Sequence, residues 1–373
     1  MPARRDVLLL EPFYGGSHRA FVDGLRRHSR HRVEALTLPA RFWKWRMRGA
    51  AIVLAGRMKG LRRRPDLVLA SDMLSVADLK ALLGPKAPPV LLYMHENQLS
   101  YPVPRGETVD YQFGFTNVTS CLAAEGVLFN SAFHRDAFFG ALPGFLRMMP
   151  DCRPKGVPGE IRKKSSVLPL GCELADFAPR RASPGGPGRS GPLTILWNHR
   201  WEFDKAPEEF FRVLYRLQAD RLRFRLIVCG ENFQAEPRAF LEARRRLRNR
   251  VVHFGFEPSR ARYAALLSKA DVVVSTAVQE NFGLSVIEAM YAGSYPLLPR
   301  RLSYPEILPP PFHGDHLYED AEDLCGRLRA LLRGGIPPGF DREGLRRGLS
   351  GYDWRVMIER YDRTFDAFGK QRG

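Results

Sequence analysis

Short apolar runs of four to six residues recur along the chain and alternate with longer segments that have the apolar spacing of helices. Runs with few polar interruptions are typical of parallel strands that helices cover on both faces. The pattern therefore predicts an α/β protein built from βαβ units. The predicted strands are 7–10, 66–70, 90–93 and 126–129 in the first half, and 194–197, 224–229, 251–254, 271–275 and 294–298 in the second.

One segment, 178–192, breaks this alternation. It is rich in Pro, Gly, Ser and Arg and has no periodicity, as is typical of a linker. With 373 residues the chain is long enough for two cores, and we expect two doubly wound domains, 1–177 and 193–351. Ligands bind at the carboxyl ends of the strands in such folds, so both sheets are expected to face a cleft there. The apolar spacing of 352–373 predicts a final helix.

Composition removes several classes of protein. No apolar run reaches the roughly 20 residues that a membrane-spanning helix needs. The first apolar run, 7–10, is too short for the core of a signal peptide. The five cysteines are scattered and form no Cys-x-x-Cys pair, which predicts reduced thiols in a cytoplasmic protein and no zinc site.

The charge is large and unevenly placed. The formal net charge is +18, and residues 1–64 hold 16 Lys or Arg against 4 Asp or Glu, a net +12. Such an excess favours a phosphate-rich partner, either nucleic acid or an anionic membrane. The alternative is a protein that is simply rich in Arg throughout. A second Arg-rich segment, 242–250, is expected to be a solvated helix face.

Candidate binding residues follow two of the predicted strands in the first half. Gly15 and Gly16 lie between the first strand and a helix expected to begin near Ser17, where a phosphate could approach the backbone; a plain tight turn is the alternative. After strand 90–93 comes a run of four polar residues, where ligands of α/β sheets bind. They are His95, Glu96, Asn97 and Gln98. Three further polar residues either line the same cleft or cap a helix: Tyr111, Gln112 and Asn117.

Two cations follow the first strand of the second half. Arg200 and Lys205 lie in the loop after strand 194–197, before a helix that is expected to begin around Pro207. Both could reach one diphosphate and stabilise its negative charge as it leaves. The alternative is a surface ion pair with Glu202 or Asp204.

The stretch QENFGLSVIEA, 279–289, places two carboxylates around a strand-to-helix turn. We expect the helix to begin near Gly283, so that the amides of Phe282, Gly283 and Leu284 point out of its amino end. Glu280 could then hold sugar hydroxyls, and Glu288 could grip a ribose diol. The spacing does not suggest a pair of hydrolytic acids.

These motifs together resemble a known superfamily. ENFGLSVIEA is similar to the Glu-x7-Glu signature of retaining GT-B glycosyltransferases, and Arg200 and Lys205 match their diphosphate-binding cations. The glycine pair and His95 match the glycine loop and cleft histidine of their N-terminal domain. A narrower resemblance, to the tRNA-queuosine mannosyltransferase family, rests on EPFYGGSH, LPARFWKWRMR, HENQLSYPV, PDCRPK, WNHRWEFDK and SYPEI.

The resemblance implies two Rossmann-like domains in the GT-B arrangement, with the final helix crossing back onto the first. It implies transfer of mannose from GDP-mannose to the cyclopentene diol of queuosine in a tRNA anticodon, with retention and with no metal or cofactor. In that mechanism the leaving diphosphate takes the acceptor proton. The implied catalytic residues are His95, Arg200, Lys205 and Glu280. The implied donor-binding residues are Gly15, Gly16, Arg200, Lys205, Glu280, Asn281, Phe282, Gly283, Leu284 and Glu288.

Acceptor binding is expected mainly in the first domain. Aromatic and cationic residues alternate in RFWKWRMR, a combination that stacks bases and neutralises phosphates. The alternative is an amphipathic helix with Trp43 packed inward. The candidates are His18, Trp43, Trp45, Arg46, Arg48, Asn97, Gln98, Tyr111 and Gln112. Two other functions stay open: a same-fold transferase that acts on a lipid or surface glycan at the membrane, and a non-catalytic RNA-binding protein.

Overall fold

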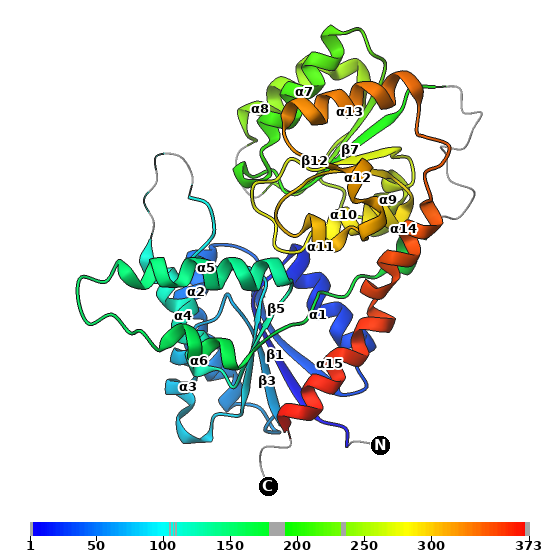
Figure 1. The fold of residues 1–373 in the computed structure, drawn as a ribbon. Coiled ribbons are helices and arrows are strands. Elements are labelled where there is room, and N and C mark those ends of the chain that lie inside the picture. The colour runs from blue at the N-terminus through cyan, green and yellow to red at the C-terminus, as the bar shows by residue number, and fades with distance from the viewer. Residues whose placement is uncertain are drawn as a thin grey trace. The chain divides into compact units, whose positions relative to one another are not determined.

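The computed structural model describes residues 3–103, 106, 108, 110–178, 191–232 and 236–369. Most of the expected linker, 179–190, lies outside the described residues. The chain forms two compact units, Met1–Cys172 with Tyr352–Gly373, and Glu173–Gly351 (Figure 1).

The first unit is built on six parallel strands in the order β2-β1-β3-β4-β5-β6. The four strands predicted in this half are confirmed as β1, β3, β4 and β5. Two edge strands were missed, because β2 is largely half-exposed and mixes polar with apolar residues, and β6 is only three residues long. The strands are β1 Asp6–Tyr14, β2 Arg32–Pro39, β3 Leu67–Ser71, β4 Val90–Met94, β5 Gly126–Phe129 and β6 Ser165–Val167.

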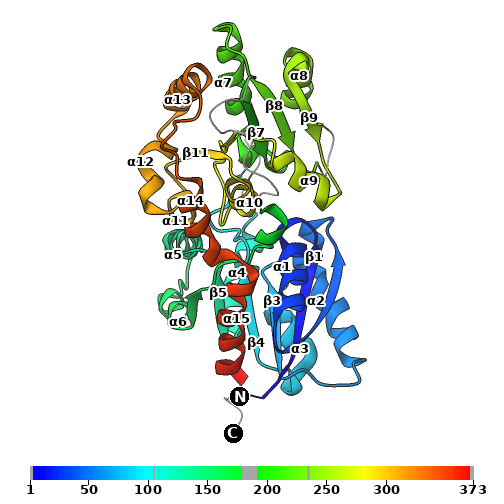
Figure 2. The same cartoon turned by 90° about the vertical axis from the view of Figure 1, so that its right-hand side faces the viewer.

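Helices cover both faces of this sheet (Figure 2). They are α1 Gly16–His28, α2 Trp43–Lys59, α3 Val76–Leu83, the 3-10 turn η1 Gly84–Lys86, α4 Tyr111–Ala123, α5 Ala132–Arg147, α6 Val157–Lys163 and α15 Trp354–Gly369. The main core lies between the strands and α2, α3, α4 and α5.

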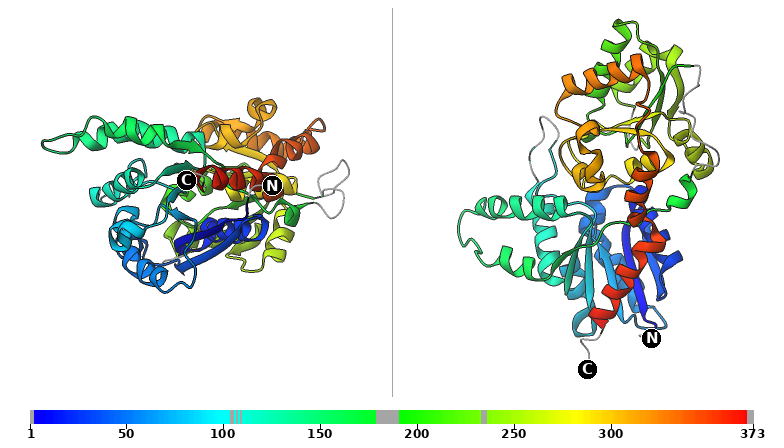
Figure 3. Two further views of the ribbon diagram at one scale, coloured as in Figure 1. Left: turned by 90° about the horizontal axis from the view of Figure 1, so that it is seen from below. Right: turned by 45° about the vertical axis from the view of Figure 1, so that its right-hand side comes forward.

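The last helix, α15, packs against α1 in the first unit and runs along the sheet towards the end where the chain begins (Figure 3). Its first residue, Trp354, is buried against two glycines. A Cβ atom would lie 2.0 Å from the Trp354 ring at Gly24 and 2.2 Å from it at Gly171, so no larger residue fits at either position. The close approach is reinforced by an isolated parallel β-bridge between the backbones of Cys172 and Asp353.

The second unit has six parallel strands in the order β12-β11-β10-β7-β8-β9. All five strands predicted in this half are confirmed, with shifts of a few residues at their ends. The two-residue β12 was missed. The strands are β7 Thr194–Asn198, β8 Arg225–Cys229, β9 Val251–Gly255, β10 Val272–Val274, β11 Tyr295–Pro299 and β12 Leu317–Tyr318.

The helices of this unit also surround their sheet, and a core rich in Trp and Phe lies beneath them. The helices are α7 Pro207–Ala219, α8 Arg238–Arg246, α9 Arg260–Leu267, α10 Leu284–Ala292, α11 Tyr304–Ile307, α12 His313–His316, α13 Ala321–Gly334 and α14 Arg342–Leu349. The 3-10 turns are η2 Leu174–Phe177, η3 Phe203–Lys205, η4 Arg248–Arg250, η5 Pro310–Phe312 and η6 Ser350–Tyr352, the last of which reaches the first unit.

Each sheet reverses its strand order at one place, and ligands of open α/β sheets bind at such a switch point. In the second unit the reversal lies between β7 and β10, and in the first unit it lies between β1 and β3. The loops that follow these strands therefore hold the residues of interest.

Candidate functional site

At the switch point of the second unit, the loops after β7 and β10 are joined through Lys205. The Lys205 Nζ donates to the Gln279 carbonyl at 2.6 Å and lies 3.4 Å from the Glu280 Oε2. It also lies 3.1 Å from the Asp204 Oδ2. Backbone amides of residues 278 and 279 donate to the Asp204 carbonyl, which ties the two loops together. Two residues separated by 75 positions, Lys205 and Glu280, are thus brought into contact.

The electrostatics of this group keep Lys205 charged. Burial opposes the charge, but the attraction of Glu280 and Asp204 outweighs it and raises the pKa of Lys205. The Arg200 Nη2 lies 3.3 Å from the Glu202 Oε2, and the Arg200 side chain is 38% exposed. Both ion pairs that the sequence left open therefore exist. One cation is buried and rigidly held, whereas the other sits on the exposed side of the same loop.

The turn before α10 is shaped by Gly283. Its φ of +95° is left-handed, which favours glycine, and a Cβ there would lie 2.9 Å from the Ile307 Cδ1, so that methyl group would have to move. The Gly283 carbonyl accepts the amides of Val286 and Ile287, and α10 begins at Leu284 as predicted. No side chain caps this helix. Next to the turn, Asn281 and Phe282 are buried, so their side chains support the loop from within.

Glu288 lies in α10 and is buried against two polar partners from α9. The Tyr263 hydroxyl donates to its Oε2 at 3.2 Å, and the Arg260 Nη1 lies 3.5 Å from its Oε1. Asn198, at the end of β7, donates to the same tyrosine oxygen at 3.1 Å. Burial raises the pKa of Glu288 to about 7, against the opposing effects of Arg260 and Tyr263. Neither Tyr263 nor Arg260 was singled out in the sequence, because nothing in their local pattern marks them.

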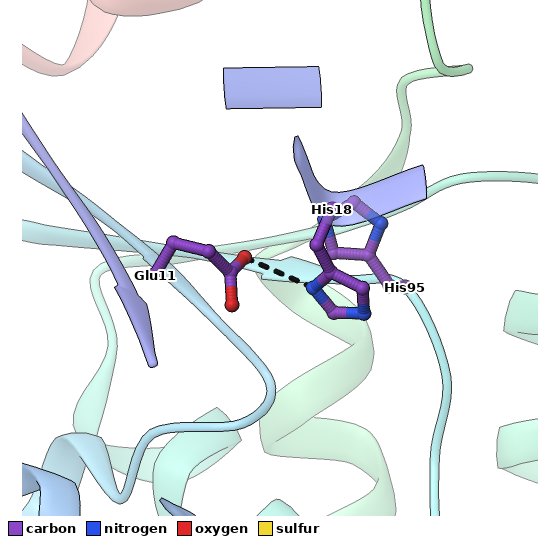
Figure 4. A group of neighbouring side chains, drawn as sticks. All are labelled: Glu11, His18 and His95. Carbon is purple, nitrogen blue, oxygen red and sulfur yellow. Dashed lines mark hydrogen bonds and ion pairs between the residues drawn. The ribbon is translucent and has the colours of Figure 1, made fainter. Parts of the chain in front are cut away.

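A second polar group forms at the switch point of the first unit (Figure 4). The His18 Nδ1 donates to the Glu11 Oε2 at 2.9 Å, and the His18 ring lies against that of His95 with 4.0 Å between centroids and a tilt of 33°. The other oxygen of Glu11 accepts from the Phe13 amide and from the Ser71 hydroxyl. Glu11 was missed as a site residue. The available signal was an acid that directly follows the apolar run 7–10, and the structure shows that it is fully buried.

The two histidines differ in charge. Burial works against a charge on His18, but Glu11 outweighs it, with help from Asp72 and Glu96, and raises the pKa of His18 to about 9. Burial, and then the charge on His18, lowers the pKa of His95 well below its ordinary value. Burial raises the pKa of Asp72, whose Oδ1 accepts the His95 amide at 2.8 Å, above its ordinary value. The group is a charged pair beside a neutral imidazole.

The Glu11, His18 and His95 ligand atoms lie within 4.8 Å of one another, close enough to be tested as a metal centre. The His18 Nδ1, however, donates a hydrogen bond to the Glu11 Oε2 at 2.9 Å, so this nitrogen carries a proton and offers no lone pair to a metal. Tetrahedral or octahedral coordination requires convergence at about 2.0–2.1 Å from each nitrogen. The arrangement therefore favours an ion pair over a bound metal.

Several predicted residues of the first unit have local structural roles. The Asn97 Oδ1 accepts the amides of Leu99 and Ser100, and its Nδ2 donates to the Ser100 hydroxyl, so this fully buried side chain shapes a turn. The neighbouring Gln98 is half-buried and donates its side-chain amide to the Glu96 carboxylate. The Gly15 backbone is extended, and a Cβ there would lie 2.4 Å from that of Ala40. Gly15 thus allows two loops to approach, and Gly16 adopts a left-handed φ of +50°.

The aromatic and cationic residues of α2 separate into buried and exposed members. Trp43 packs on Phe113, with 5.0 Å between ring centroids, in a small apolar cluster. Trp45 is 76% exposed. Arg46 and Arg48 are tethered, by hydrogen bonds to the Pro39 carbonyl and the Thr116 hydroxyl respectively. Tyr111 and Gln112, at the start of α4, are exposed.

None of the helices in the described ranges combines the length and the apolar content that crossing a bilayer requires.

Two protein families match the chain. Residues 6–172 match the family described as tRNA-queuosine alpha-mannosyltransferase N-terminal, and residues 183–337 match glycosyl transferases group 1. The tRNA-queuosine alpha-mannosyltransferase of Drosophila melanogaster is 36% identical over 337 residues, which cover 89% of this chain and 88% of that protein. A GDP-mannose:cellobiosyl-diphosphopolyprenol alpha-mannosyltransferase of Xanthomonas oryzae is 26% identical over 55% of this chain and 54% of its own.

Solved structures share the fold at low identity. Sucrose-phosphate synthase from Thermosynechococcus elongatus superposes with a TM-score of 0.71 at 15% identity, covering 98% of this chain and 99% of its own. Anabaena HepE in complex with UDP gives a TM-score of 0.69 at 15% identity, with 97% and 100% covered. With the two parallel sheets, these likenesses establish the expected GT-B fold class.

Proposed function

We infer the function of this chain from its family: it belongs to the tRNA-queuosine alpha-mannosyltransferases and is a hexosyltransferase of the GT-B class. We propose that it transfers mannose from GDP-mannose to the cyclopentene diol of queuosine in a tRNA anticodon. The supporting observation is the polar group at the switch point of the second sheet, where Lys205 meets Glu280 and where Glu288 is held by Tyr263 and Arg260.

On this proposal the second unit binds the donor. Lys205 and Arg200 lie against the diphosphate and stabilise the charge that develops as it leaves. Glu280 and the amides of residues 282–284 orient the hexose. The Glu288 carboxylate accepts hydrogen bonds from the ribose diol, with its position fixed by Tyr263.

The chemical step needs no covalent enzyme intermediate. The acceptor oxygen bonds to the anomeric carbon as the bond from that carbon to the diphosphate oxygen breaks. The hydroxyl proton moves to the departing diphosphate on the same face of the sugar, so the configuration is retained. In the proposal the two cations supply the charge stabilisation that a divalent metal supplies elsewhere, and no metal takes part.

In the first unit, we propose that His95 contacts the substrate as a neutral imidazole. His18 and the buried Glu11 act on His95 as positioning residues. The His18 ring lies against one face of the His95 ring, and the positive charge on His18 disfavours protonation of His95. The exposed Trp45 is proposed to stack on a base of the tRNA, and Arg46 and Arg48 are proposed to lie near its phosphates.

Mass spectrometry of nucleosides tests the proposal. Queuosine-containing tRNA is incubated with the protein and one nucleotide sugar in each reaction, and the tRNA is then digested. The four nucleotide sugars are GDP-mannose, GDP-glucose, UDP-glucose and UDP-galactose. We expect a queuosine nucleoside heavier by one hexose with GDP-mannose, and none with the Glu288→Gln variant. A product with another donor would overturn the sugar assignment. Transfer to a polyprenyl lipid but not to tRNA would replace the acceptor with the membrane alternative.

A further inference from the structure

The positive charge of the chain is concentrated in two segments. Besides the net +12 of residues 1–64, residues 221–250 hold nine Arg and three acidic residues, a net +6. The remaining parts of the chain, 65–220 and 251–373, hold 33 basic and 33 acidic residues and are neutral. The second segment therefore accounts for all of the excess charge outside the first, and it belongs to the second unit.

Four arginines of this segment surround a hollow of about 380 Å³. It is lined by Pro192, Gln218, Arg223, Phe224, Arg225, Arg246, Leu247, Asn249 and Arg250. The lining residues belong to the end of α7, the end of α8 with η4, and the start of β8. Helices α7 and α8 lie beside β8 and β9 in Figure 2. Its charge comes from elements that are adjacent in space and not from one solvated helix face.

The hollow lies at the amino ends of the strands, whereas the donor loops follow the carboxyl ends. Strand β8 begins at Arg225, which pairs with Thr194 at the start of β7, and Leu226 pairs with Val251 at the start of β9. The loops that hold Lys205 and Glu280 instead follow the carboxyl ends of β7 and β10. Five residues of strand β8 span about 13 Å, so one ligand group cannot occupy both places.

The four arginines differ in how they are held. Arg223 lies just before β8 and Arg225 is its first residue, and both are exposed with the buried Phe224 between them. Neither forms an ion pair with any residue that the structure describes. The other two are held in place. Arg246 forms an ion pair with Glu242 at 2.9 Å, and its guanidinium lies 3.7 Å from the Tyr215 ring centroid. Arg250 lies over Phe224 and donates to the Leu222 carbonyl.

We propose that this hollow is a second polyanion site, which binds the phosphate backbone of the RNA acceptor away from the nucleoside that is modified. The inference rests on the proposed function for its choice of RNA. Planar guanidinium groups bind phosphate oxygens in a bidentate manner, and Gln218 and Asn249 offer hydrogen bonds to the sugar-phosphate chain.

A membrane surface fits the hollow less well. Helices that lie on bilayers insert exposed apolar residues beside their basic ones. The two large apolar members of this lining, Phe224 and Leu247, are buried. A concave, polar and cationic surface suits a ridge of phosphates.

The test compares two double variants of equal charge. In Arg223→Gln/Arg225→Gln the two unpaired arginines of the hollow are neutralised. In the control, Arg212→Gln/Arg333→Gln, two exposed arginines of the same unit are neutralised that lie outside the hollow and in no ion pair with a described residue. Binding of queuosine-containing tRNA is measured from 0.05 to 0.5 M salt, with the melting temperature and GDP affinity as checks of folding and of the donor site.

We expect the log–log salt slope to fall by roughly 0.7 to 0.9 for each arginine of the hollow, and affinity at 0.1 M salt to fall about sixfold for each lost contact. The control variant should keep the wild-type slope. Equal slopes in both double variants, with wild-type protein binding and glycosylating tRNA, would overturn the site while leaving the proposed function intact. If wild-type protein does not bind tRNA at all, both fail. A hollow variant that loses binding to phosphatidylserine vesicles but not to tRNA would also overturn the proposal.

Discussion

At the scale of single residues, Arg200 and Lys205 carry the same charge in different surroundings, and their removal should have different consequences. Arg200→Ala should slow transfer by about 100- to 1000-fold with unchanged stability, because Arg200 is partly exposed. Lys205→Ala should slow transfer similarly and also destabilise the fold by roughly 3–5 kcal/mol, because it leaves the buried Asp204 without its cation. Transfer rates and urea unfolding measure both effects.

The partner of Arg200 provides the control. If Arg200 only formed a surface ion pair, Glu202→Ala would reproduce the effect of Arg200→Ala on transfer. We expect Glu202→Ala to retain near-wild-type turnover. Near-wild-type turnover in Arg200→Ala and Lys205→Ala would instead exclude the diphosphate assignment.

Glu288 should make donor binding depend on pH. Its pKa of about 7 means that the carboxylate form, which accepts from a ribose diol, is the minor form at pH 6 and the major form at pH 8. If only that form binds the diol, affinity should rise by about tenfold over this interval. Calorimetry with GDP and with 2′,3′-dideoxy-GDP isolates the effect, because phosphate titration is common to both ligands. A ratio of the two affinities that is constant with pH would contradict the ribose assignment, and Glu288→Gln should show that constant ratio.

The Glu11–His18 pair should stabilise the first unit in a defined pH window. The folded pKa of His18, about 9, lies above its ordinary 6.5, so the stabilisation is complete below pH 6.5 and is lost as pH rises through 9. Over this window the free energy of unfolding should fall by on the order of 3 kcal/mol. Urea unfolding at both pH values measures the fall.

The variant Glu11→Gln removes the charge that raises the pKa, so its stability should change little across that window. Glu34→Gln, at an exposed glutamate of β2, should behave as wild type. A wild-type slope in Glu11→Gln would mean that His18 is not charged by this carboxylate.

At the scale of elements, helix α2 contributes to packing through Trp43 and is proposed to contribute to tRNA binding through Trp45. Trp43→Ala should lower the melting temperature, by an amount corresponding to at most about 3 kcal/mol, since the ring packs on Phe113 but is only half-buried. Trp45→Ala should leave stability unchanged and weaken tRNA binding by about 1–3 kcal/mol, with little change in salt dependence. Thermal melts and tRNA titrations on the same two variants distinguish the roles. The opposite pattern would assign base stacking to Trp43.

At the scale of the whole molecule, the charge distribution predicts how tRNA affinity responds to salt. Affinity should fall steeply with salt, and Arg46→Ala and Arg48→Ala should each reduce the log–log slope by roughly 0.7 to 0.9, because each removes one phosphate contact. GDP affinity should not change. Arg333→Ala, in the neutral part of the second unit, should keep the full slope. A tRNA affinity independent of salt would direct attention to the membrane-acceptor alternative.

The sequence by itself determined the α/β class, nine of the twelve strands found in the described residues, and the family signature. Buried parallel strands are written as continuous apolar runs, which can be recognised locally. The strands that the sequence did not predict are β2, β6 and β12. They lie at sheet edges, where the strand is only partly buried or is very short. The Gly283 turn and the start of α10 were likewise predictable, because backbone conformation there is set by adjacent residues.

Only the tertiary structure decided which side chains meet. Glu288 is held by Tyr263 and Arg260 from another helix. His18 is paired with Glu11 from β1 and lies against His95 from the loop after β4. The assignment of Trp43 to packing and of Trp45 to solvent also required the neighbouring helix α4. A side chain's partners, and with them its charge, depend on which elements the fold places beside it, and no local pattern of residues records that placement.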